Sequence, residues 1–233
     1  TLALTLVTIV ILQHMRREGE ATLEHVQASV LLSTEYEFPY LTAIGTVLQG
    51  WELTRVGQVV EGLTQMRAGL AAFRAMSAEI LRPNLLALFA DACGCGGQIE
   101  AGLSALEEAL VTAEQHAERF YEAELHRLKG ELILRQWREA GIQPAPSTIQ
   151  SGHTASRETA GRVSLHRDAE ACFQRALTIA RRQGARLLEL RAALSLSRLW
   201  QHHGQRAAAR QLLTEVYGWF TEGFETADLQ EAQ

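Results

Sequence analysis

The stretch that decides the fold of this chain is "GQVVEGLTQMRAG", residues 57–69. Its Gly-Gln pair is followed by a small residue, Gly62, then by a large apolar residue, Met66, and then by Gly69. The same order returns twice, in residues 97–109, "GQIEAGLSALEEA", and in residues 204–216, "GQRAAARQLLTEV". A pattern that recurs in this way predicts one structural unit that is used several times.

The spacing of the small residues gives the length of the repeat. Gly62 and Gly102 are 40 residues apart, and so are Ala169, which lies in "DAEACFQRAL", and Ala209. The interval from Gly102 to Ala169 is 67, which exceeds one repeat by 27. The excess matches residues 138–166, which are rich in Gly, Ser, Thr and Pro, and we expect these residues to form a disordered surface insertion.

Small residues also recur in the segment that precedes each of these stretches, at Gly50, Ala90, Gly130 and Ser197. A small residue in each of two neighbouring helices lets the helices approach closely, and larger residues three or four positions away fill the remaining space. Each pair then leaves one apolar face uncovered, so the pairs must stack on one another. The composition agrees, because Leu, Ala, Glu, Gln and Arg are abundant and only four residues are Pro.

These patterns predict an all-α fold: a single domain, residues 1–233, in which antiparallel helix pairs stack into a right-handed, TPR-like (tetratricopeptide) solenoid. We expect about five pairs, with the first turn extrapolated to Gly19-Glu20. The expected repeats are residues 1–36, 37–80, 81–117, 118–184 and 185–218, followed by a C-terminal cap at residues 219–233. The repeat of 40 residues exceeds the usual TPR period of about 34, and a HEAT-like array is the alternative.

The end of the chain is expected to cover the last repeat, because a terminal repeat has no neighbour to bury its apolar face. Trp219, Phe220 and Phe224 are the large apolar residues that remain for this purpose. Thr226 is a plausible N-cap for a short closing helix, and Asp228 suits its positive end.

A more specific likeness lies in the second half of the chain. The stretches "FYEAELHRLKGELIL", "AEACFQRALTIARRQGARLLELRAALSLSRLWQHHGQ" and "YGWFTEGFETADLQEA" resemble the C-terminal TPR region of a bacterial family that joins a class III nucleotide cyclase domain and a P-loop ATPase to a TPR tail. The resemblance implies that this chain is such a tail, and the lack of an initiator Met agrees with a piece of a longer protein. No GxxxxGK[ST] motif and no matching pair of metal-binding Asp occur, so the catalytic residues of the family map onto nothing here.

Composition and motifs disfavour several other functions. The net charge of −5 argues against nucleic acid, and the opening apolar run of twelve residues is too short to span a membrane. Cys93 and Cys95 are the most tempting metal ligands, but no second pair completes a tetrahedral set, and Cys93 falls on an apolar helix face. None of the eight His lies at a spacing that indicates a nucleophile pair. We therefore expect no catalytic residue, no metal and no cofactor in this chain, and a cytoplasmic location.

The concave wall of the solenoid is the candidate binding surface, because the first helix of each pair lines the groove in TPR-like arrays. We expect a protein-interaction or sensory scaffold that binds a protein, a peptide or a sister domain of the same chain. A regulatory module for a small ligand is the alternative, and an enzyme is disfavoured. The residues expected to face the groove are Trp51, Arg55, Asn84, Asp91, Arg127, Glu131, Arg135, Arg191, Arg198 and His202.

Overall fold

The computed structural model describes residues 4–5, 8–9, 11, 22–139 and 155–233. Every regular element in these residues is a helix, and they contain no strand. The helices are α2 (Thr22–Glu35), α3 (Pro39–Arg55), α4 (Val59–Ala75), α5 (Arg82–Cys95), α6 (Ile99–Gln115), α7 (Glu122–Glu139), α8 (Ala155–Gln183), α9 (Arg186–His202), α10 (Arg206–Tyr217) and α11 (Ala227–Glu231). The all-α prediction is confirmed, while the expected first turn at Gly19-Glu20 lies outside the described residues.

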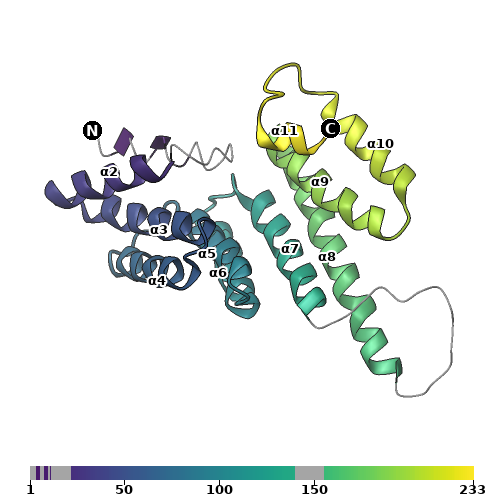
Figure 1. Ribbon diagram of the computed structural model, residues 1–233, viewed down its shortest axis with the longest axis horizontal. Helices are drawn as coiled ribbons and strands as arrows, with labels where there is room; N and C mark the ends of the chain where they lie inside the picture. The colour runs from purple at the N-terminus through teal and green to yellow at the C-terminus, as the bar shows by residue number, and fades with distance from the viewer. Residues whose placement is uncertain (1–3, 6–7, 10, 12–21, 140–154) are drawn as a thin grey trace.

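The helices pack as successive pairs, and the pairs stack into a solenoid (Figure 1). Helix α3 pairs with α4, α5 with α6, α7 with α8, and α9 with α10, while α2 packs against α3. The first helices of the four pairs also contact one another in order, from α3 through α5 and α7 to α9. Four first helices therefore form one continuous wall, and this wall positions the candidate site.

Small residues let the two helices approach closely in the pairs α3–α4, α7–α8 and α9–α10, as the repeat predicts. A Cβ atom added to Gly50 in α3 would lie 2.5 Å from the carbonyl oxygen of Gly62 in α4, and one added to Gly62 would meet the carbonyl oxygen of Gly50. A Cβ atom on Gly130 in α7 would lie 2.5 Å from the ring of the fully buried Phe173 in α8. In the last pair, the Ser197 hydroxyl donates a hydrogen bond of 3.3 Å to the Ala209 carbonyl.

The turns between pairs repeat their backbone conformation with the same spacing. Glu37, Ser77, Ala117 and Gly184 all have positive φ, at 54°, 52°, 56° and 66°. These positions are separated by 40, 40 and 67 residues, as are the small residues of the helices. The left-handed conformation is uncommon for residues with a side chain, so its recurrence shows that one turn geometry is required at every junction.

The predicted disordered insertion, residues 138–166, is wrong at both of its ends. Helix α7 continues to Glu139, and α8 begins at Ala155, so residues 155–166 are helical. Leu165 packs against the core of the last pairs, and the ring of His166 lies 5.0 Å from that of Trp137 in α7. These contacts show that the paired helices α7 and α8 extend into the segment for which composition predicted disorder. Residues 140–154 lie outside the described residues.

The C-terminal cap lies within residues 219–233 as expected, but of the three expected aromatic residues only Phe220 packs against the core of the last pairs in the way expected. Trp219 is 59% exposed and Phe224 is 41% exposed, whereas Leu229 in α11 is 2% exposed and packs against the core of the last pairs. Phe220 is half-buried against the same core. The Trp219 ring lies under the guanidinium of Arg186, with Cζ 4.0 Å from the ring centroid. The short helix α11 therefore carries the apolar contact that the sequence assigned to Trp219.

We predict that Gly62→Ala destabilises the chain by roughly 1–3 kcal/mol or more, because the added methyl group meets backbone atoms that cannot rotate away. Gly218→Ala is the matched control. Its added Cβ would lie 3.3 Å from the Thr214 carbonyl oxygen and its φ is −63°, so its effect should be much smaller than that of Gly62→Ala. Urea unfolding followed by circular dichroism measures both variants, and equal stabilities would contradict the close-contact role of Gly62.

A second comparison separates the two candidate capping residues. Leu229→Ala should lower the free energy of unfolding by about 2–5 kcal/mol, because it empties a buried site. Trp219→Ala should cost about 1 kcal/mol or less, since it removes an exposed ring and one cation–π contact. Amide exchange in α9 and α10 should accelerate only in the Leu229 variant, because coupling in a solenoid runs between neighbours. The reverse order of effects would restore Trp219 as the cap.

Candidate binding groove

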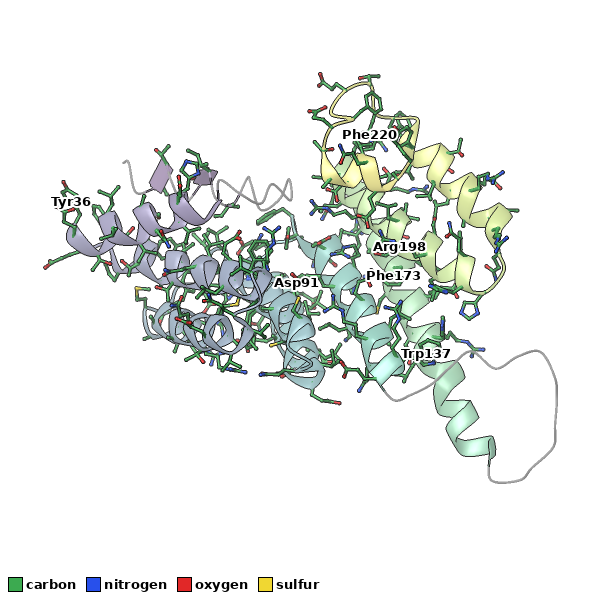
Figure 2. The ribbon with its side chains drawn as sticks, viewed as in Figure 1. Tyr36, Asp91, Trp137, Phe173, Arg198 and Phe220 are labelled. Carbon is green, nitrogen blue, oxygen red and sulfur yellow. The ribbon has the colours of Figure 1, made fainter. Side chains whose placement is uncertain are left out.

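A cavity of about 520 Å³ runs along the wall of first helices. Its lining comes from α3, α5, α7 and α9, with Tyr121 before α7 and Glu231 from α11. Figure 2 shows Asp91 on α5 and Arg198 on α9, on either side of α7. Eight of the ten residues proposed for the groove line this cavity: Trp51, Arg55, Asp91, Arg127, Glu131, Arg135, Arg191 and Arg198.

The other two proposed residues lie elsewhere. Asn84 lines a separate small cavity with Leu48, Leu88 and Tyr121, and its buried Oδ1 has no hydrogen-bond partner among the described residues. His202 is the last residue of α9 and is exposed. Neither residue belongs to the charged cavity.

Repeat spacing explains which side chains meet in the groove. Residues 51, 91, 131 and 198 occupy equivalent places in the four first helices, and residues 55, 95 and 135 form a second row nearer the helix ends. Because neighbouring first helices pack side by side, equivalent residues become neighbours across the wall. The groove chemistry is therefore set by residues about 40 positions apart in the sequence.

Trp51 and Arg55 form an ordered platform at one end of the groove. The Trp51 indole Nε1 donates a hydrogen bond of 3.2 Å to Oδ2 of Asp91, and Trp51 is only 6% exposed. The Arg55 guanidinium lies over the Trp51 ring, with Cζ 4.9 Å from its centroid. A cation over an aromatic face is attracted by the ring quadrupole, so the platform orients the guanidinium.

Arg127 is the centre of a buried charge network. Its Nε and Nη2 donate to the two carboxylate oxygens of Glu124 at 2.9 and 2.7 Å, and its Nη1 lies 3.6 Å from Glu131 Oε1. Glu131 accepts a further bond of 2.6 Å from the Ser195 hydroxyl in α9. Burial alone would lower the pKa of Arg127, but the charges and hydrogen bonds of Glu124, together with Glu131 and Asp91, raise it above its usual range.

The far end of the groove is closed by carboxylates from α11. Arg191 donates from Nε and Nη2 to Asp228 Oδ2 at 2.9 and 2.7 Å, and both side chains are buried. Arg198 forms an ion pair with Glu231. Thr226 does occupy the N-cap position of α11, but its hydroxyl donates to the Gly223 carbonyl and does not cap the helix. Asp228 therefore forms an ion pair with Arg191 in addition to lying in the first turn of α11.

Sequence reasoning missed several groove residues: Tyr121, Glu124, Ser195, Asp228 and Glu231. One signal was available for Glu124, since it precedes Arg127 by three residues in a helix, where opposite charges meet. No local signal connects Ser195 or the two α11 carboxylates to the groove, because each contact depends on tertiary packing. A wall that carries five Arg and four carboxylates beside its Leu residues suits a ligand that has charged groups.

The cysteines differ sharply in environment. Cys93 is fully buried in the core, as its apolar face predicted, and burial raises the pKa of its thiol to about 11. Cys95 is exposed and lines the groove between Arg55 and Arg135. Cys172 is half-buried, and burial raises its pKa as well. Across the described residues, no three side chains that bind metals lie together.

Comparisons with known proteins identify the architecture. No family model matches the chain, and no curated protein matches it. Two solved structures of a Podosopora anserina putative kinesin light chain, described as nearly identical TPR-like repeats, are similar to it. They share 13% and 14% of the sequence, cover 92% of this chain and 92% of theirs, and give TM-scores of 0.57 and 0.55.

This chain has the TPR-like fold. Sequence identities this low show the fold alone, so the groove must be interpreted from its own residues. The TPR-like solenoid still explains why the cavity lies on the wall of first helices. Among the described helices, none combines the length and the apolar character needed to cross a bilayer.

The charge network generates a prediction about stability. Glu124→Gln should lower the free energy of unfolding by about 3 kcal/mol, because it leaves Arg127, whose side chain is only 18% exposed, without its main partner. Glu107→Gln removes a carboxylate that is 65% exposed and paired with Lys129, so its effect should stay within about 0.5 kcal/mol. Chemical denaturation of both variants gives the comparison, and a small loss for Glu124→Gln would show that the network is not stabilising.

Proposed function

We propose that this chain is an interaction scaffold whose groove binds a polypeptide segment of a partner protein or of a sister domain. The observation that carries the proposal is the continuous cavity along α3, α5, α7 and α9, which contains fixed side chains from all four pairs. A site that crosses several repeats suits an extended ligand better than a compact one. Trp51 and the Arg residues are also the types that dominate binding energy at interfaces.

We also propose that the scaffold is the regulatory C-terminal tail of a cytoplasmic, multidomain nucleotide cyclase and ATPase signalling protein. The support is the likeness of "FYEAELHRLKGELIL" and "YGWFTEGFETADLQEA" to that family, together with the TPR-like fold. The sequence of the complete gene tests the idea directly. A neighbouring domain without cyclase or ATPase motifs would contradict it.

A small polar ligand is the second candidate. The cavity volume of about 520 Å³ falls within the range of about 300–1,000 Å³ that is usual for small-molecule sites. Such sites are mostly apolar, however, whereas this wall contains five Arg and several carboxylates. The composition of the lining therefore favours a polypeptide.

The groove can be tested through Cys95. A bulky maleimide should react there first, because Cys95 is exposed while burial raises the pKa of both Cys93 and Cys172 and so suppresses their thiolates. We expect peptides selected on the chain from a random phage-displayed library to lose binding after this labelling. Isothermal titration calorimetry measures the loss, and mass spectrometry verifies single modification.

The matched control is Cys95→Ala treated with the same reagent. This variant should keep its peptide binding, because nothing bulky then enters the groove. Two results would contradict the proposal: selection that enriches no peptide, or selected peptides that bind the labelled chain as tightly as the unlabelled one. A small molecule that stabilises the chain only when Cys95 is unlabelled would support the second candidate.

A further inference from the structure

The groove wall contains five arginines, and they divide into two groups by their partners. Arg127, Arg191 and Arg198 each pair with a carboxylate of this chain: Glu124, Asp228 and Glu231 respectively. Arg55 and Arg135 lack a comparable partner. They lie on α3 and α7, on either side of the end of α5.

Arg55 is held in place without being neutralised fully. Among the described residues, its only ion-pair contact is a single one of 3.5 Å from Nη1 to Glu52, at the limit of hydrogen-bond distance. The guanidinium rests on Trp51, which is itself fixed by Asp91. The side chain is 36% exposed, so most of its five N–H donors remain available in a defined orientation.

Arg135 lies close to the backbone of Gly94 in α5. A Cβ atom on Gly94 would collide with Nη1 of Arg135 and would lie 2.7 Å from Cδ2 of Leu132. The guanidinium therefore occupies space that any larger residue at position 94 would take. Arg135 is half-buried, and no ion pair to it occurs within the described part of the chain.

The carboxylates of the wall are already used by other groups. Asp91 accepts from Trp51, Glu131 accepts from Ser195 and lies beside Arg127, and Glu231 pairs with Arg198. Around Cys95, the wall therefore presents two guanidinium groups, those of Arg55 and Arg135, for which the described residues provide no carboxylate closer than 3.5 Å. A preorganised guanidinium in a partly buried groove favours a carboxylate, because it can bind both oxygens at once.

We infer that the polypeptide bound by the groove is acidic, and that Arg55 and Arg135 bind its Asp or Glu side chains on the two sides of Gly94 and Cys95, at the end of α5. This inference rests on the proposed function and names the chemistry of its ligand. Helix α11 gives an example within the chain, since it presents two carboxylates, Asp228 and Glu231, to Arg191 and Arg198 of the same wall. An acidic ligand would extend this mode of contact along the groove.

The test uses peptides selected on the unmodified chain from a random phage-displayed library. The selected sequences should be enriched in Asp and Glu, and replacing these residues by Asn and Gln should weaken binding. Arg55→Gln and Arg135→Gln should each weaken binding roughly 10- to 100-fold, because each removes a charged hydrogen-bond donor while keeping most of the side-chain stem. Gly94→Ala should weaken binding less than Arg135→Gln does, since it shifts the guanidinium but keeps its charge.

Arg210→Gln is the matched control, because Arg210 is exposed on α10 and does not line the groove. It should leave affinity unchanged, and thermal unfolding should show that all four variants keep the fold. The inference is overturned if neutral or basic peptides are selected and Cys95 labelling still blocks them, in which case the groove function stands. It is also overturned if both groove Arg variants bind acidic peptides as tightly as Arg210→Gln does. Failure to select any peptide overturns the inference and the proposed function together.

Discussion

The contact between small residues inside each helix pair is the constraint on which the rest of this structure depends. Where Gly50 meets Gly62, the two backbones approach so closely that neither position can accept a methyl group. That approach fixes the separation of the two helices and leaves their larger residues, such as Met66, to fill the space around the contact. Because a small residue returns at the equivalent place in each first helix, at intervals of 40, 40 and 67 residues, each pair presents similar faces to the next, and the stack is regular.

Regular stacking in turn creates the groove. Equivalent residues of successive first helices become neighbours, so Trp51 reaches Asp91 across 40 residues of sequence, and Glu131 in α7 reaches Ser195 in α9. These contacts give Asp91 and Glu131 partners within the chain and orient the aromatic and charged groups of the wall. A surface prepared in this way loses less conformational entropy when it binds a ligand, which supports recognition by a small number of oriented guanidinium groups.

The end of the chain shows how the same wall is completed. Helix α11 buries Leu229 against the last pairs and places Asp228 beside Arg191, so a single short helix supplies both an apolar contact and a countercharge. The buried pair is expensive to desolvate and depends on good geometry, which the two bonds from Arg191 to one carboxylate oxygen provide. Trp219 lies outside this arrangement and contacts Arg186 instead.

The sequence by itself determined the helix pairs, their period and the wall that faces the groove, because small residues at fixed intervals can be recognised without knowing the fold. It predicted eight residues of the cavity for the same reason, since position in the repeat decides which face a side chain occupies. The polar composition of residues 155–166 predicted a disordered segment, but these residues are helical. Leu165 and His166 in this segment pack against other helices, and the sequence alone did not indicate those contacts. Only the tertiary structure decided that Leu229 rather than Trp219 closes the array, and which arginines keep free donors. Both outcomes depend on distances between side chains remote in sequence, and no local pattern records those distances.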